Sequence, residues 1–342
     1  MPTHPDNLPS LDAQPVADSL GRVHTNLRIS VTDRCNIRCF YCMPDEQIRF
    51  QPREELLSFE EIESLVRAVI PMGINRLRIT GGEPLVRASL PELIGRLAAI
   101  PGICDLAMTT NGILLSEQAE ALAQAGLQRL NVSLDGLSEE TFQQITRRKG
   151  LDRVLSGIES ARQIGFDRIR LNAVAIRGIS EQEIVPLGQF ARESGLELRF
   201  IEFMPLDAEG NWKTDQVLSG ETIRELLEAA YGPLQALPRP DPSQPAVDFA
   251  FSDGIGRIGF INPVTQPFCQ DCNRLRVTAE GQLRNCLFSN QEWDVRKLLR
   301  NQADPANIQS LVRECVANKK PGHGIDSDDF LRPKRAMYQI GG

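Results

Sequence analysis

The sequence predicts an α/β protein: an incomplete (β/α)6 TIM-type barrel whose open side is closed by a C-terminal extension of antiparallel strands and helices. Two observations predict it. From about residue 26, six short β-rich segments alternate with segments of helical periodicity, which is typical of a parallel sheet. Near residue 205 this alternation stops. Six units rather than eight indicate a barrel open on one side, and a doubly wound sheet is the alternative.

The predicted strands are rich in Leu, Ile and Val. They cover residues 27–31, 77–80, 106–109, 130–134, 169–174 and 196–203. The first predicted helix begins at Ser58, which forms a capping box with Glu61. A second begins at Ser116 and ends at Gly126. Three more cover 138–145, 151–165 and 180–195, the last in spite of its internal Pro186.

The C-terminal third has a different pattern. Residues 238–245 form a Pro-rich linker or loop. Two antiparallel pairs follow at 247–261 and 275–288, with turns at Asp253-Gly254 and Glu280-Gly281, and then helices near 294–299 and 305–317. We therefore divide the chain into a flexible leader (1–22), the barrel (23–237) and a C-terminal region (238–342).

Composition limits the function classes. Hydrophobic residues make up 41% and charged residues 24%, which is typical of a soluble globular protein. The formal net charge of −7 argues against a nucleic-acid or anionic-membrane surface. No apolar run approaches the roughly 18 residues of a membrane span. The polar, Pro-rich start does not resemble a secretory signal, so we expect a cytoplasmic protein.

Six of the eight cysteines fall into two groups of three; Cys104 and Cys315 stand alone, and we expect both to be buried. Cys35, Cys39 and Cys42 form C-x3-C-x2-C just after the first strand. Three thiolates on one short loop can hold a [4Fe–4S] cluster with one iron left open. A structural zinc site would need a fourth ligand.

The second group, Cys269, Cys272 and Cys286, is C-x2-C-x13-C and predicts a second cluster. Zinc with His323 as the fourth ligand is the alternative. Arg274 and Arg276 follow directly and would share one face of a strand. Two guanidiniums beside a cluster make a site for a polyanion, although two solvated arginines remain the alternative.

The first cysteine motif, at this place in a β/α series, resembles the radical S-adenosylmethionine superfamily. Thr80-Gly81-Gly82-Glu83-Pro84 resembles the GGE motif of that superfamily. The sequence from about residue 20 onward resembles the GTP 3′,8-cyclase family of molybdenum cofactor biosynthesis. The segments that carry this resemblance are LRISVTDRCNIRCFYCMP, MTTNG, LNVSLD, LRFIEFMP, FCQDCNRLRVTAEGQLRNCLF and a C-terminal diglycine.

The resemblance implies two [4Fe–4S] clusters, S-adenosylmethionine as co-reactant and GTP as substrate. It implies that S-adenosylmethionine contacts Tyr41, Gly82, Ser133 and Met204. It implies that GTP contacts Arg28, Arg78, Thr109, Arg170, Arg274, Leu275 and Arg276. Position 170 departs from the family, which commonly has lysine there. The resemblance further implies that Arg274, Arg276, Gly341 and Gly342 take part in catalysis, with the tail entering the active site; an unstructured end is the alternative.

The implied reaction begins with a 5′-deoxyadenosyl radical, which abstracts the ribose 3′ hydrogen of GTP. The sugar radical attacks guanine C8, and an electron and a proton complete (8S)-3′,8-cyclo-7,8-dihydroguanosine 5′-triphosphate. The implied partners are a low-potential electron donor, the downstream cyclic pyranopterin monophosphate synthase and a second copy in a homodimer. The rival functions are another radical enzyme that modifies a peptide or tRNA, and a zinc-binding interaction protein without catalytic activity.

Overall fold

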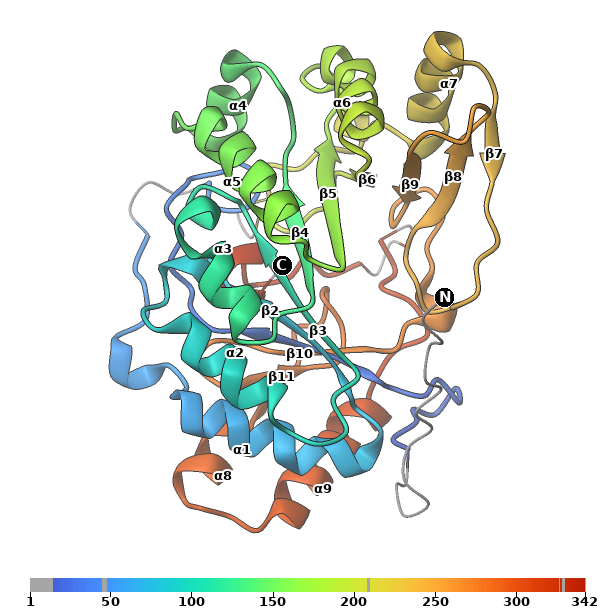
Figure 1. Ribbon diagram of the computed structural model, residues 1–342. Coiled ribbons are helices and arrows are strands. Elements are labelled where there is room, and N and C mark those ends of the chain that lie inside the picture. Colours follow the sequence, from blue (N-terminus) through green and yellow to red (C-terminus); the bar gives the residue numbers. More distant parts are fainter. Residues whose placement is uncertain (1–14, 45–47, 208–209, 326, 328–329, 342) are drawn as a thin grey trace.

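The protein is described by a computed structural model that covers residues 15–44, 48–207, 210–325, 327 and 330–341. One mixed sheet of 12 strands, with helices packed against it, forms its frame (Figure 1). Six strands lie side by side in chain order and run parallel, as the sequence predicts. They are β1 (Asn26–Ser30), β2 (Arg76–Thr80), β3 (Asp105–Thr110), β4 (Arg129–Ser133), β5 (Arg168–Ala175) and β6 (Glu197–Glu202).

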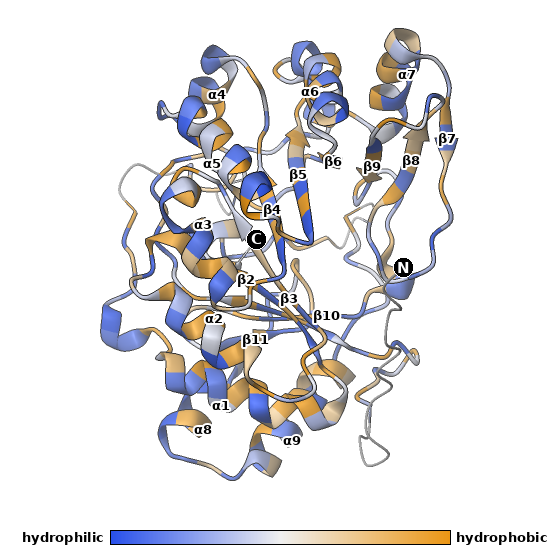
Figure 2. Cartoon of the chain, in the orientation of Figure 1, coloured by the Kyte–Doolittle hydropathy of each residue, from blue (hydrophilic) through white to orange (hydrophobic). Residues whose placement is uncertain are grey.

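Alternation along these strands separates an apolar face from a polar one. In β1, Leu27 and Ile29 are buried in the main core, whereas Arg28 between them faces the opposite side. The apolar face packs against helices with mixed surfaces, hydrophobic on one side and hydrophilic on the other (Figure 2). The polar face is therefore available for a site.

The predicted helices are present; up to residue 231, one boundary is wrong and two helices were missed. Ser58 and Glu61 form the expected capping box. Ser116 does not open its helix: the N-cap is Leu114, because a turn that begins at Gly112 already leads the chain into the helix. The helices up to this point are α1 (Phe59–Val69), α2 (Leu90–Ala98, missed), α3 (Leu115–Gln124), α4 (Glu139–Thr146), α5 (Leu151–Ile164), α6 (Glu181–Ser194) and α7 (Gly220–Tyr231, missed).

The C-terminal region extends both edges of the parallel sheet. β9 (Arg257–Ile261) pairs parallel with β6, and β10 (Arg274–Val277) pairs parallel with β1. Each also belongs to an antiparallel pair, as expected from the two turns. The remaining elements are β7 (Leu234–Ala236), β8 (Val247–Phe251), β11 (Gln282–Arg284), β12 (Trp293–Asp294), α8 (Arg296–Arg300), α9 (Pro305–Ala317) and α10 (Met337–Ile340).

Two expectations about single segments need correction. Residues 15–22, expected within a flexible leader, pack onto the C-terminal region: Arg22 pairs with Asp18 at 2.5 Å and donates to the Cys269 carbonyl at 2.8 Å. Residues 1–14 lie outside the described part of the chain. Cys315 is buried as expected, but Cys104 is exposed, in the loop that leads into β3. In the described ranges, no helix has the length and apolarity needed to cross a bilayer.

Candidate active site

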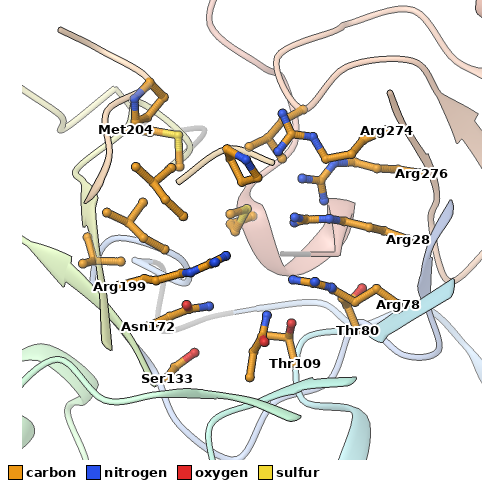
Figure 3. A pocket seen from close by; sticks show the side chains of 18 of the residues that line it. Arg28, Arg78, Thr80, Thr109, Ser133, Asn172, Arg199, Met204, Arg274 and Arg276 are labelled. Atoms are coloured by element: carbon orange, nitrogen blue, oxygen red, sulfur yellow. The ribbon is translucent and has the colours of Figure 1, made fainter. Parts of the chain in front are cut away.

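A cavity of about 620 Å³ lies on the polar face of the sheet. Its wall includes side chains from all six parallel strands and from β10 (Figure 3). Side chains of both cysteine groups line it as well. The fold thus joins segments from the two ends of the chain. The predicted site residues that line the cavity are Arg28, Cys35, Cys39, Tyr41, Cys42, Arg78, Gly82, Thr109, Ser133, Arg170, Met204, Cys269, Cys272, Arg274, Arg276 and Cys286.

The first cysteine group occupies the loop after β1. The backbone N–H groups of Cys42 and Met43 donate to the Cys39 carbonyl at 3.0 and 2.7 Å, which folds the loop around the cavity. Burial, with the Glu83 charge adding to it, raises the pKa of Cys35 to about 11. Burial also raises the pKa values of Cys39 and Cys42. Three thiols on one short loop fit an iron–sulfur cluster, whose iron would supply the positive charge that lets them ionise.

The glycine pair after β2 packs against the backbone of this loop. Gly82 N–H donates to the Thr32 carbonyl at 2.7 Å. A Cβ on Gly82 would lie 2.5 Å from the Arg34 carbonyl oxygen, and one on Gly81 would lie 2.8 Å from that of Thr32. The lack of a side chain at both positions lets the turn after β2 approach the segment that leads into the cysteine loop. Gly82 also lines the cavity, so its ligand contact stays a prediction.

Glu83 connects the same turn to β3. Its carboxylate accepts hydrogen bonds from Thr110 Oγ1 at 2.6 Å and from Asn111 N–H at 2.7 Å. Burial raises the pKa of Glu83 to about 7. Asn111 Nδ2 in turn lies 3.7 Å from Cys35 Sγ. The sequence prediction omitted Asn111, although the position of the MTTNG segment at the end of a parallel strand could have indicated it.

Tyr41 faces the cavity beside a buried carboxylate. Its hydroxyl donates to Asp135 Oδ2 at 2.7 Å, and its ring lies edge-on to Phe203 with centroids 6.4 Å apart. Burial raises the pKa of Asp135 to about 6. Ser133, at the end of β4, and Met204, just after β6, line the cavity as well (Figure 3). Asp135 was not predicted, although it belongs to the LNVSLD segment that supplied Ser133.

The second cysteine group comes from two turns. Cys269 and Cys272 lie just before β10, and Cys286 follows β11. Burial raises the pKa of Cys272, but the positive charges of Arg274 and Lys319 outweigh burial and lower that pKa to about 6. Arg274 Nη2 and Lys319 Nζ lie 3.3 and 3.4 Å from Cys272 Sγ. A thiol that ionises readily, with two more beside it, fits a second iron–sulfur cluster.

The zinc alternative depends on His323. This residue lines the same cavity, with its ring centroid 4.9 Å from that of Phe288. Across the ranges that the structure describes, no three Cys, His, Asp or Glu side chains are placed to hold one metal ion. This finding applies equally to Cys269, Cys272 and Cys286, so iron and sulfide analysis is needed to separate zinc from a cluster.

Arg28, Arg78 and Arg276 form a row across three neighbouring strands. The register places Arg28 opposite Arg276 of β10 on one side and opposite Arg78 of β2 on the other. Figure 3 shows these side chains and Arg274 extending from one wall. Within the described residues none of the four is ion-paired with a carboxylate. Such uncompensated charge favours the binding of a polyanion.

The electrostatics of this row agree with its geometry. Burial and the neighbouring Arg276 and Arg274 lower the pKa of Arg28 well below its ordinary value. Burial and Arg28 do the same to Arg78. Arg28 Nε is buried and has no hydrogen-bond partner among the described residues. Each guanidinium thus lacks the anion that would stabilise its charge.

Comparison with known proteins identifies the family. The model described as the Radical SAM superfamily matches residues 29–191, and that described as Molybdenum Cofactor Synthesis C matches residues 196–325. A Rhodopirellula baltica protein named GTP 3′,8-cyclase is 52% identical over 342 residues, which cover 99% of this chain and 95% of that protein. The chain belongs to the GTP 3′,8-cyclase family.

Further matches agree with this membership. A Pelotomaculum thermopropionicum member named GTP 3′,8-cyclase is 42% identical over 325 residues, 95% of this chain and 99% of that protein. The fold also resembles the crystal structure of Streptococcus suis SuiB bound to S-adenosylmethionine. That match has a TM-score of 0.58 and 16% identity, and covers 82% of this chain and 66% of that one. The match to SuiB supports the α/β radical S-adenosylmethionine fold.

In this GTP 3′,8-cyclase family member, other arginines of the cavity have acidic partners. Arg170 is ion-paired with Glu197, and burial lowers the pKa of Arg170 to about 10. Arg199, which the sequence prediction missed, enters the cavity from β6 (Figure 3) and donates to Asp248 Oδ2 at 3.3 Å. The sequence could have indicated Arg199, because Arg199, like Arg170, lies between apolar residues in a parallel strand. The arginine at position 170 is therefore partly neutralised before any ligand binds.

Two predicted residues, Leu275 and Gly341, do not belong to the cavity wall. The Leu275 side chain is turned into the core and is 2% exposed, because it alternates with the two arginines that flank it. The Gly341 carbonyl accepts a hydrogen bond from Arg276. A Cβ on Gly341 would lie 2.7 Å from Thr80 Oγ1, so this part of the tail is closely packed. Gly342 lies outside the described residues.

Proposed function

We propose that this chain is a radical S-adenosylmethionine lyase that converts GTP to (8S)-3′,8-cyclo-7,8-dihydroguanosine 5′-triphosphate, the first step of molybdenum cofactor biosynthesis. The observation that carries the proposal is the row of Arg28, Arg78 and Arg276. It has no carboxylate partner among the described residues and shares one cavity with two three-cysteine groups. The names of the relatives at 52% and 42% identity support it.

Cys35, Cys39 and Cys42 would hold the first [4Fe–4S] cluster, and three protein ligands leave one iron open for S-adenosylmethionine. When bound, these groups supply the 5′-deoxyadenosyl radical that starts the reaction. The protein's own part is to bind and orient. Tyr41, fixed by its hydrogen bond to Asp135, presents a ring to the cavity and would contact adenine. Gly82, Ser133 and Met204 would complete the contacts.

Cys269, Cys272 and Cys286 would hold the second [4Fe–4S] cluster and bind GTP through its guanine. The arginine row would then hold the triphosphate, since a guanidinium can donate two hydrogen bonds to phosphate oxygens. Each such charge-assisted bond contributes about 1.5–3 kcal/mol. Thr109 and Arg170 also line the cavity and would add contacts, although Arg170 must share its charge with Glu197.

Several finer statements belong to the same proposal. We take the parallel strands to be an incomplete (β/α)6 barrel, residues 23–237, with residues 238–342 as the region that closes it. Gly341 and Gly342 would act as a tail that enters the active site; the bond between the Gly341 carbonyl and Arg276 supports this. A low-potential electron donor, the downstream cyclic pyranopterin monophosphate synthase, a homodimer and a cytoplasmic location stay predictions.

The test is anaerobic reconstitution, followed by incubation of the reduced protein with S-adenosylmethionine and GTP. We expect about eight irons and eight sulfides per chain, formation of 5′-deoxyadenosine, and a product with the mass of GTP and a new bond between C3′ and C8. Zinc without sulfide would contradict the cluster assignment. Formation of 5′-deoxyadenosine without consumption of GTP would contradict the substrate.

A further inference from the structure

Lys319 is a buried cation beside the second cysteine group. It follows α9, and its N–H donates to the Val316 carbonyl at 3.0 Å, so the last turn of the helix fixes its backbone. The residue is 5% exposed. Its Nζ lies 3.4 Å from Cys272 Sγ and 2.9 Å from the Arg274 carbonyl oxygen. The ammonium therefore bonds to a cysteine sulfur and to the strand that carries the arginines.

The charge of Lys319 needs an anion, because burying an unpaired ammonium is unfavourable. Within the described residues, Lys319 is ion-paired with no carboxylate. Burial lowers its pKa, whereas Cys272 and Cys286 raise it. The sulfurs of the second group are thus the negative charge that this side chain faces. Lys320, the next residue, is exposed and offers a matched control.

We propose that Lys319 is a positioning residue that hydrogen-bonds the Cys272 sulfur and raises the reduction potential of the cluster held by the second cysteine group. The inference deepens the proposed function and rests on it, because it requires that cluster. Reduction adds one electron, and hence one negative charge, to the cluster. A cation and an N–H donor at a ligating sulfur stabilise the reduced form more than the oxidised form.

The alternative is a purely structural role, in which Lys319 only ties the end of α9 to β10 through the Arg274 carbonyl. That role predicts a change in thermal stability for any shortened or apolar side chain, with no change in potential. The two roles are separated by measuring the potential, because a hydrogen bond to a backbone carbonyl does not touch the cluster.

The test uses the full chain with Cys35, Cys39 and Cys42 replaced by Ala, so that only the second group can hold a cluster. Lys319→Met, Lys319→Gln, Lys319→Arg and Lys320→Met are made in this background. Each is reconstituted anaerobically, analysed for iron and sulfide, and titrated with dithionite while the reduced cluster is followed by electron paramagnetic resonance.

We expect Lys319→Met to lower the reduction potential of the cluster by about 59 mV. At the midpoint potential of the parent protein, which keeps Lys319, this one-electron shift lowers the ratio of reduced to oxidised cluster about tenfold. Lys319→Arg should stay near the parent, and Lys320→Met should not shift. A fully loaded Lys319→Met with the parent's potential overturns the inference. If Lys319→Met cannot hold the cluster, a lower potential in Lys319→Gln than in Lys319→Arg supports it, and equal potentials overturn it. If the parent protein, which keeps Lys319, does not bind about four irons and four sulfides, the assignment of the second cluster is wrong. This outcome is distinguishable from a failure of the inference about Lys319.

Discussion

The two cysteine groups of this protein each offer three thiols, but their surroundings are opposite. Around the first group, Glu83 and Asp135 add to burial and raise the pKa values of Cys35 and Cys39. Around the second, Arg274 and Lys319 lower the pKa of Cys272 to about 6. Cysteine spacing thus sets how many ligands a loop offers. Residues far away in sequence set the charge around those ligands, and with it the chemistry each group favours.

Replacing one cysteine in each group gives the largest expected effect. Cys39→Ala should abolish 5′-deoxyadenosine formation and GTP consumption together, because the first cluster would start the reaction. Cys272→Ala should abolish GTP consumption but leave some 5′-deoxyadenosine, because only the substrate's cluster is lost. Chromatography of both products checks this.

The matched control is Cys104→Ala, which removes an exposed thiol that lies in neither group. It should leave both products unchanged. Equal loss of 5′-deoxyadenosine in Cys39→Ala and Cys272→Ala would contradict separate roles for the two groups.

The cluster-free protein should show the same contrast in thiol reactivity. At pH 7 a thiol with a pKa of about 6 is roughly 90% thiolate, whereas those of the first group are almost entirely protonated. Iodoacetamide should therefore modify Cys272 roughly 100 times faster than Cys39, as followed by mass spectrometry. The rate at Cys272 should rise with pH around 6 and level off above 7.

Lys319→Met should move that rise at Cys272 to higher pH, since loss of the cation favours the protonated thiol. Exposed Cys104 serves as the internal reference in every sample. Cys39 reacting as fast as Cys272 would remove the contrast between the groups.

The sequence predicted most of the frame, as well as cysteines and arginines that the structure brings to one cavity, because these follow local rules. Strand alternation placed Arg274 and Arg276 on one face, and a capping box marked Ser58. Partners that come from another part of the chain were not predictable. Asp135 meets Tyr41 and Lys319 meets Cys272 only because the sheet brings separate segments together.

The same limit explains the errors. Strand alternation predicts that Leu275 points away from the site. We nevertheless assigned it a GTP contact, because it lies between Arg274 and Arg276 in the family motif. Residues 15–22 have a leader's composition, yet the bonds of Arg22 to the Cys269 and Lys320 carbonyls bind them to the second group. Composition cannot show such a partner, since it lies some 250 positions away in the chain.

Arg28→Met tests whether the arginine row serves the substrate rather than the clusters. GTP should bind roughly 10- to 100-fold more weakly, from the loss of a bond of about 1.5–3 kcal/mol. The melting temperature without GTP should rise, because an unpaired buried charge is removed. Calorimetry and thermal melts check both. Arg67→Met, which removes an exposed arginine paired with Glu63, should change neither; unchanged GTP affinity in Arg28→Met would contradict the row's assignment.

Gly82→Ala acts on the first group alone, through the backbone of the cysteine loop. Its Cβ would lie 2.5 Å from the Arg34 carbonyl, a backbone atom of the cysteine loop, so the loop must shift. About half of the iron and sulfide should be lost on reconstitution, with the second cluster retained. Gly322→Ala is the control, since its nearest neighbour would be 4.0 Å away. Full iron content in Gly82→Ala would show that the loop tolerates the shift and would contradict this role of the glycine.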